Sequence, residues 1–177
     1  MNNPRVEEYH KTMKLEKTTE QDKKESINIA RNLKEWFTKE AIKKMEKDFL
    51  KENLLVIKEN GTVVGFLCYR LEKNKMKIIW MGVKRELQRK GIGKKLLFKL
   101  EIESKKHNLN IIQVETLTDK DKYEPYFITR NFYYKNKFKK IRYKKSKIQG
   151  NDDLVILEKE LTYKLFSPKD LKLSNSS

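Results

Sequence analysis

Residues 78–101 read IIWMGVKRELQRKGIGKKLLFKLE, and this stretch decides how the rest of the chain is interpreted. Its first six residues have the length and apolar composition of a buried strand. A polar connection follows and ends at two glycines, Gly91 and Gly93. Apolar side chains then recur at helical spacing, at Ile92, Leu96, Leu97 and Leu100. The pattern predicts a strand, a glycine turn and a helix, in that order.

The glycine turn is suited to bind a phosphate group. The first amides of a helix have no partner within the helix, and the helix dipole adds positive potential there. Gly91 and Gly93 have no Cβ, so a ligand can approach the backbone closely. Four basic side chains surround the same point: Arg89, Lys90, Lys94 and Lys95. The sequence therefore predicts a cradle for a pyrophosphate.

Two familiar phosphate-binding patterns do not fit this turn. A dinucleotide fingerprint needs a third glycine where Leu96 stands, and a P-loop needs glycine in place of Gln88 and a hydroxyl in place of Lys95. Residues 88–93 instead resemble the coenzyme-A-binding motif Gln/Arg-x-x-Gly-x-Gly/Ala of the GNAT superfamily of N-acetyltransferases. The structural alternative is a glycine-containing loop before an amphipathic helix.

A second motif extends the resemblance. Residues 126–133 follow the pattern Tyr-x-x-Thr-Arg-x-Phe-Tyr, which is similar to one bacterial and archaeal branch of that superfamily. The Trp36-Phe37 pair and the stretch 153–157 also resemble that branch, so the likeness covers about residues 13–161. Two motifs in the expected order are more specific than either motif alone.

The sequence departs from the family pattern at two places. Lys137 stands where the family has a glycine, so we expect the preceding Asn136 to take the left-handed conformation that ends the helix. Lys77 stands where relatives often carry an acidic residue in the fourth strand, as a candidate base. The usual base of the family is therefore missing at its usual position.

The resemblance implies acetyl-CoA as the co-substrate and direct transfer of its acetyl group to a primary amine. The alternative function is a non-catalytic acyl-CoA-binding or nucleic-acid-associated module on the same fold. The implied coenzyme A contacts are Met81, Gly82, Val83, Gln88, Arg89, Lys90, Gly91, Ile92, Gly93, Lys94, Tyr126 and Thr129. Pantetheine would pair with the backbone of Met81 and Val83 if the strand splays there, and Gly82 is the predicted bulge. A strand amide near Val83 could stabilise the oxyanion.

Two residues are candidates for the proton transfers of this reaction. By the resemblance, Tyr133 would protonate the leaving thiolate. A phenol titrates near ~10, so it can protonate a thiolate of similar basicity. The alternative for Tyr133 is packing in the core. Glu115 is the candidate base, with a chain of waters as the alternative carrier and a solvated strand residue as the structural alternative. Cys68 could be imagined as an acyl-relay nucleophile, although inert packing is the favoured interpretation.

The charge composition of the chain indicates which kinds of partner it could bind. The chain has 42 Lys and Arg against 25 Asp and Glu, a net charge of +17 over 177 residues. A Lys-rich proteome or an anionic partner would each explain this excess. Basic residues concentrate at 135–147 and alternate with Phe138 and Tyr143, which suits nucleic acid. A solvated basic strand edge is the favoured interpretation.

The rest of the composition argues against a metal site and against a membrane-spanning helix. One cysteine excludes an internal disulfide, and with two histidines it leaves too few soft ligands for zinc. No apolar run approaches the ~18 residues of a membrane helix, and the first residues lack an apolar signal core. We therefore expect a cytoplasmic protein without metal. The acceptor, a small-molecule or peptide amine, is not identified by the sequence, and a homodimer is compatible with it.

The pattern along the chain predicts one mixed α/β domain at residues 12–163, after a loose segment 1–11 and before a polar tail 164–177. The resemblance implies a GNAT-like fold, in which a mostly antiparallel twisted sheet of about six to seven strands has helices on both faces. Strands are expected at 13–18, 54–57, 63–70, 76–83, 111–116, 138–143 and 154–161. Helices are expected from residue 20, at 39–51, at 93–107 and at 126–135.

Overall fold

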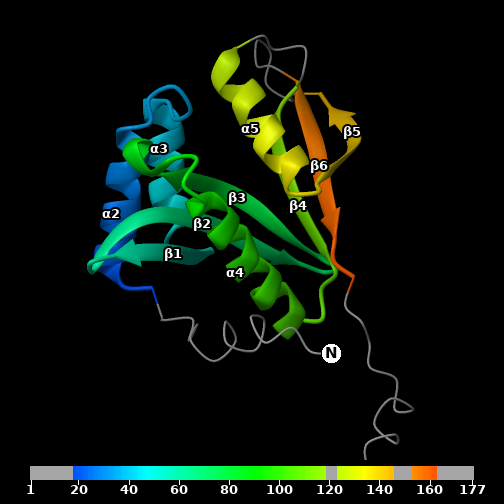
Figure 1. Cartoon of the computed structure of the whole chain (residues 1–177), viewed down its shortest axis with the longest axis horizontal. Helices are drawn as coiled ribbons and strands as arrows, with labels where there is room; N and C mark the ends of the chain where they lie inside the picture. Colours follow the sequence, from blue (N-terminus) through cyan, green and yellow to red (C-terminus); the bar gives the residue numbers. More distant parts are fainter. Residues whose placement is uncertain (1–17, 119–122, 146–152, 163–177) are drawn as a thin grey trace, which may run out of the picture.

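Figure 1 shows the computed structural model of the chain, which describes residues 18–118, 123–145 and 153–162. The helices are α2 (Glu20–Arg31), α3 (Lys39–Asp48), α4 (Ile92–Lys106) and α5 (Glu124–Lys135). The strands are β1 (Asn53–Glu59), β2 (Thr62–Glu72), β3 (Lys75–Val83), β4 (Ile111–Leu117), β5 (Lys139–Lys144) and β6 (Leu154–Glu160). Apart from Thr18, the predicted strand at 13–18 lies outside the described residues, as do segments 1–11 and 164–177.

The described strands form one six-stranded sheet in the order β1-β2-β3-β4-β6-β5. Only β3 and β4 pair in parallel, across the helical crossover α4, while the other neighbouring strands are antiparallel. This confirms the predicted mixed, mostly antiparallel sheet. None of the described helices is long and apolar enough to cross a membrane.

Helices cover both faces of this sheet, as Figure 1 shows. One apolar cluster gathers α4 residues with β3 and β4 residues, and it includes Tyr133 of α5. The cluster on the opposite face joins α2 and α3 to β1 and β2, where Phe66 is fully buried. Strand side chains alternate between these two clusters, because successive Cβ atoms of a strand point to opposite faces.

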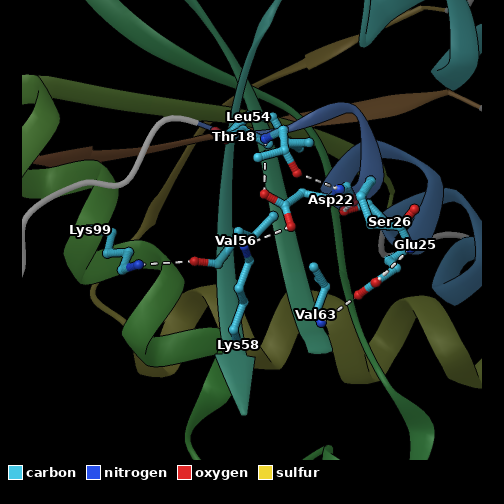
Figure 2. Close-up of polar contacts among 11 residues, drawn as sticks. Thr18, Asp22, Glu25, Ser26, Leu54, Val56, Lys58, Val63 and Lys99 are labelled. Carbon is cyan, nitrogen blue, oxygen red and sulfur yellow. Dashed lines mark hydrogen bonds and ion pairs between the residues drawn. The ribbon is translucent and has the colours of Figure 1, made fainter. Parts of the chain in front are cut away.

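The hairpin between β1 and β2 follows from its turn residues. Asn60 and Gly61 both have positive φ, 50° and 77°, as a tight hairpin turn requires. The turn places Lys58 beside the first turn of α2, where its ammonium lies 2.8 Å from the carboxylate of Asp22. Figure 2 shows this contact together with the bond from the amide of Val63 to Glu25, 2.7 Å. The hairpin and α2 are therefore joined by polar contacts as well as by the core.

Helix α2 begins with a capping box. The Thr19 hydroxyl accepts a hydrogen bond from the Asp22 amide, and the Asp22 carboxylate accepts one from the Thr19 amide. Burial tends to raise the pKa of Asp22, but the ammonium of Lys58 and the amide of Thr19 outweigh it and hold the pKa below its usual value. The predicted helix start at Thr18-Thr19 is therefore confirmed.

Strands β3 and β4 separate after a short paired region. Their register runs only from Met76–Ile112 to Ile78–Val114, and Figure 1 shows them diverging beyond it. On its other side β3 has a bulge, because Cys68 pairs with Trp80 while the next residue, Tyr69, pairs with Ile78. The extra residue is Ile79, so the prediction of a bulge at Gly82 is wrong.

The structure differs from the predictions at the ends of two helices in particular, α3 and α5. Helix α3 ends at Asp48 rather than at residue 51. Helix α5 begins at Glu124, so Pro125 lies in its first turn, where a missing amide hydrogen costs no helical bond. Lys137 has φ 69°, so it takes the left-handed position itself instead of Asn136.

The end of α5 has the hydrogen bonds of a Schellman motif. The amide of Phe138 donates to the carbonyl of Tyr133, 3.1 Å, and the amide of Lys137 donates to the carbonyl of Tyr134, 3.0 Å. The side chain of Asn136 donates to the carbonyl of Phe132, 2.8 Å. Asn136 therefore helps to end the helix through its side chain rather than through its backbone conformation.

Candidate functional site

The predicted phosphate cradle lies between β3 and α4. A short 3-10 helix (Arg85–Leu87) follows β3, and Gln88 then donates from its side-chain amide to the carbonyl of Val83, 3.3 Å. Arg89 and Gly91 have positive φ, 61° and 86°, and Gly91 is the N-cap of α4. These two left-handed residues turn the chain so that α4 starts beside the end of β3.

In the first turn of α4, no side chain of the helix caps the free amides or balances the helix dipole. This turn has no side-chain cap and no acidic residue. The first turns of α2, α3 and α5 each contain one or two acidic residues. The basic side chains of Arg89, Lys90 and Lys94 are exposed around it. An anion would therefore satisfy the amides and the dipole of α4 together.

The two glycines of the cradle have different roles. A Cβ on Gly91 would meet nothing within 4 Å, so glycine is needed there for its positive φ rather than for space. A Cβ on Gly93 would lie 3.0 Å from the ring of Phe132 and 3.3 Å from Cε of Met81. Gly93 therefore allows α4, α5 and β3 to pack closely beside the gap between β3 and β4.

The β3 residues predicted to contact pantetheine lie at this gap. Met81 and Val83 are partly buried against the cluster beneath α4, and neither has a backbone partner on β4, whose pairing with β3 ends at Ile78. Gly82 pairs with Phe66 on β2, and a Cβ there would stand 2.6 Å from the Phe66 ring. The glycine at position 82 is thus explained by packing of an aromatic ring.

Tyr133 points from α5 toward the same strand. Its hydroxyl lies 3.8 Å from the sulfur of Met81, and its ring packs edge-on against Phe132 and Phe138. The side chain is 5% exposed, and burial raises the pKa of the phenol above its ordinary value. The group is therefore protonated beside the gap, and its raised pKa makes it a weaker proton donor than an exposed phenol.

Tyr126 and Thr129, predicted to face the cofactor, are engaged with another segment. The indole N–H of Trp36 donates to the carbonyl of Pro125, 3.2 Å, and to the hydroxyl of Thr129, 3.1 Å. Tyr126 donates in turn to the carbonyl of Trp36, 3.3 Å. These side chains tie the α2–α3 connection to α5, and the Trp36-Phe37 pair was the only sequence signal for this contact.

Glu115, the candidate base, forms two ion pairs. One carboxylate oxygen lies 2.7 Å from the ammonium of Lys77 and the other lies 2.9 Å from that of Lys144. Burial tends to raise the pKa of Glu115, but the hydrogen bonds from the two lysines outweigh it and lower the pKa. A carboxylate with a lowered pKa binds a proton weakly, so this environment does not favour a base. No pattern in the sequence indicated Lys144 as a partner of Glu115.

Cys68 is fully buried between the sheet and the α2–α3 layer. Burial, together with the charges of Asp48 and Glu52, raises the pKa of the Cys68 thiol to about 12. A thiol with this pKa forms almost no thiolate at neutral pH. The environment therefore agrees with inert packing, and it gives no support to an acyl relay.

The chain matches the model of a known protein family. The model of the acetyltransferase (GNAT) family matches residues 15–134. No curated protein sequence matches the chain.

Solved structures share the fold. A Desulfovibrio desulfuricans protein described as a GNAT-family acetyltransferase is 19% identical, with a TM-score of 0.70 over 81% of this chain and 95% of its own. The ribosomal-protein-S18-alanine N-acetyltransferase of Escherichia coli is 14% identical, with a TM-score of 0.64 over 84% and 93%. PaiA N-acetyltransferase of Thermoplasma acidophilum, in complex with coenzyme A, is 23% identical, with a TM-score of 0.63 over 82% and 96%.

Proposed function

Because the chain belongs to the GNAT family of acetyltransferases, we propose that it transfers the acetyl group of acetyl-CoA directly to a primary amine. The observation that carries this proposal is the uncapped first turn of α4, which begins at the left-handed Gly91 beside the open end of β3. The neighbour from Thermoplasma acidophilum holds coenzyme A on the same fold. A cytoplasmic location without a metal is part of the proposal.

The chain would bind acetyl-CoA in two parts. The pyrophosphate is held by amides of the cradle, residues 89–94, with the basic side chains of Arg89, Lys90 and Lys94 around it. Pantetheine extends the sheet along the free edge of Met81 and Val83, which β4 leaves unpaired. Both contacts use the backbone, so they depend on the turn geometry more than on individual side chains.

The transfer itself needs one bond to form and one to break. The amine nitrogen attacks the thioester carbon, and an amide of β3 near Val83 stabilises the oxyanion. The C–S bond then breaks, and Tyr133 donates its proton to the departing thiolate. The attacking nitrogen loses its second proton, which returns through water to the Tyr133 oxygen and restores the phenol. The proton of the acceptor ammonium passes to water, because the lowered pKa of Glu115 disfavours it as the carrier. The products are an acetylated amine, coenzyme A and one proton.

The proposal is tested by calorimetric titration with acetyl-CoA. The wild-type chain is expected to bind at micromolar concentration, and Gly91→Glu is expected to abolish binding, because it adds a negative charge and a strained φ at the cradle. Gly61→Glu is the matched control, since Gly61 also has positive φ and open space around its Cβ but lies in the β1–β2 turn. Binding that survives in Gly91→Glu, or a wild type that does not bind, would contradict the proposal.

A further inference from the structure

The sheet is divided into two halves at the gap, because the pairing of β3 with β4 ends at Ile78 and Val114. Helices α2 and α3 pack on the half made of β1, β2 and β3, through an apolar cluster without any described residue of the other half. Helix α5 belongs to the half made of β4, β6 and β5. There the guanidinium of the buried Arg130 donates to the carbonyls of Leu117 and Thr118 at the end of β4, 3.0 and 2.7 Å. Figure 1 shows these helices on the two sides of the gap.

The proposed transfer depends on how the two halves are placed relative to each other. The thioester would lie along β3, on the first half, whereas Tyr133 belongs to α5, on the second. The C-terminal part of α5 meets the first half where the ring of Phe132 lies beside Gly93 and the hydroxyl of Tyr133 lies 3.8 Å from the sulfur of Met81. These contacts are mostly apolar and have little directional preference. The orientation of α5 therefore requires polar contacts as well.

A group of hydrogen bonds joins the two halves at the N-terminal part of α5, and we call the side chains of Trp36, Tyr126 and Thr129 the latch. The indole N–H of Trp36 is shared between the carbonyl of Pro125, 3.2 Å, and the hydroxyl of Thr129, 3.1 Å. That hydroxyl donates in turn to the carbonyl of Pro125, 3.0 Å, and Tyr126 donates to the carbonyl of Trp36, 3.3 Å. All three side chains of the latch are half-buried, so water competes less for these bonds.

The segment that carries Trp36 is itself fixed to the first half. Both carboxylate oxygens of Glu35 lie 2.6 Å from the guanidinium of Arg85, just after the end of β3. The ring of Phe37 packs edge-on against Trp80 of β3, with 6.2 Å between the ring centroids. The ion pair is exposed and contributes little, so the aromatic contact is the stronger anchor. The latch thus connects α5 to the strand that leads into the cradle.

We infer that Trp36, Tyr126 and Thr129 are positioning residues for acetyl transfer, which hold α5 against the β3 half so that Tyr133 faces the thioester. The inference rests on the proposed function and gives Tyr126 and Thr129 a role other than contact with the cofactor. A misplacement of about 1 Å can lower a rate about 10²-fold, so a few hydrogen bonds far from the reacting atoms can control the rate.

The first test measures the placement of the halves without any substrate. Spin labels are attached at Lys43→Cys on α3 and Ile128→Cys on α5, two exposed positions, while the buried Cys68 is not expected to react. Pulsed electron paramagnetic resonance then gives the distribution of distances between the labels. We expect Thr129→Val and Trp36→Phe to broaden or shift this distribution, because each removes hydrogen bonds of the latch. An unchanged distribution in both variants would overturn the inference.

Two further variants control this comparison. Thr129→Ser keeps the hydroxyl that the latch uses, so it should retain the distribution of the wild-type chain. Thr62→Val, at the exposed start of β2, makes the same substitution as Thr129→Val outside the latch and should also leave the distribution unchanged. A shift in Thr62→Val as large as that in Thr129→Val would contradict the assignment to the latch.

The second test measures the rate by thiol release from acetyl-CoA. Spermidine, glutamate and a tetrapeptide with alanine at its amino terminus are compared, and the best acceptor is used at saturation for all variants. Trp36→Phe and Thr129→Val should lower kcat about tenfold, whereas Thr129→Ser should keep most of the rate. The affinity for acetyl-CoA, measured by calorimetry, should stay within about twofold, because the cradle and the edge of β3 lie on one half.

A double-mutant cycle separates positioning from a general loss of stability. If the latch acts through Tyr133, Thr129→Val should have almost no further effect on kcat in the Tyr133→Phe background. An equal fall in both backgrounds, or an unchanged kcat in Thr129→Val alone, would overturn the inference. If the wild-type chain does not bind acetyl-CoA, the proposed function fails, whereas the label distances test the latch by themselves.

Discussion

At the scale of single residues, the environment of Tyr133 keeps its phenol protonated beside the gap and at the same time makes it a weaker acid than an exposed phenol. Its hydroxyl touches only the weak acceptor sulfur of Met81 among the contacts described for it, and the phenol is almost fully buried. Burial keeps the proton on the oxygen, because the phenolate would lose its hydration. The neighbouring Tyr134 is 40% exposed and has no such environment.

We predict that Tyr133→Phe slows acetyl transfer strongly while coenzyme A binding stays nearly intact. General acid catalysis contributes about 10²–10⁴-fold, so a fall in kcat of at least ~10-fold is expected. Thiol release under saturating acetyl-CoA measures the rate, and calorimetry measures the affinity. Tyr134→Phe is the control and should keep its rate. An unchanged rate in Tyr133→Phe would exclude this tyrosine as the acid.

At the scale of elements, the start of α2 shows how one carboxylate joins several parts of the fold. Asp22 completes the capping box with Thr19 and binds Lys58 of β1, so it connects a helix end to a strand. Figure 2 also shows Thr18 donating to the carbonyl of Leu54 and Lys99 of α4 donating to that of Val56. These bonds give β1 polar partners from both helical layers.

We predict a pH-dependent contribution of Asp22 to the free energy of unfolding. Asp22→Asn should cost about 1–2 kcal/mol at pH 7, through the weakened cap and the lost ion pair. Because the folded-state pKa is lowered, the wild-type advantage is complete above the unfolded pKa of about 4. The advantage should shrink as the pH falls below that value through the folded-state pKa.

Urea unfolding of both proteins between pH 7 and pH 3 measures this difference. Glu20→Gln is the matched control, because Glu20 lies in the same helical turn but its side chain is 75% exposed. Its effect should be small at every pH. A difference between wild type and Asp22→Asn that stays constant down to pH 3 would contradict the prediction.

At the scale of the whole molecule, positive charge is distributed unevenly. Residues 125–151 contain no Asp or Glu. The strand β5 lies at one edge of the sheet, and exposed aromatic rings occur on it and on α5, at Phe127, Tyr134 and Tyr143. The bulge at Ile141 and the lysines along β5 discourage pairing of this edge with another strand. A homodimer through this edge is therefore disfavoured by charge.

We predict that nucleic acid binds this surface only weakly and without specificity. Binding of a random single-stranded RNA should weaken at least ~10-fold between 50 and 200 mM salt, since binding to several phosphates releases counterions. Fluorescence anisotropy at both salt concentrations measures it, with transfer activity recorded in parallel. Tight binding at physiological salt would favour the alternative in which the fold serves a nucleic-acid-associated module.

Much of the fold follows from signals within a few residues. The Asn60-Gly61 dipeptide specified a hairpin, Thr18-Thr19 specified a helix start, and the glycines at 91 and 93 indicated a turn before α4. The ends of helices and strands were less predictable where one residue is compatible with two kinds of local structure. Pro125 indicated a loop, although the first helical turn tolerates it equally well.

The sequence by itself determined the family, the strand–turn–helix cradle and the order of the elements, because turn residues and apolar periodicity act over short distances. Only the tertiary structure decided the extra residue at Ile79, the early parting of β3 from β4 and the sharing of Glu115 between Lys77 and Lys144. Those features depend on which strands lie side by side and in which register. Lateral pairing joins residues far apart in the chain, so no local pattern encodes it.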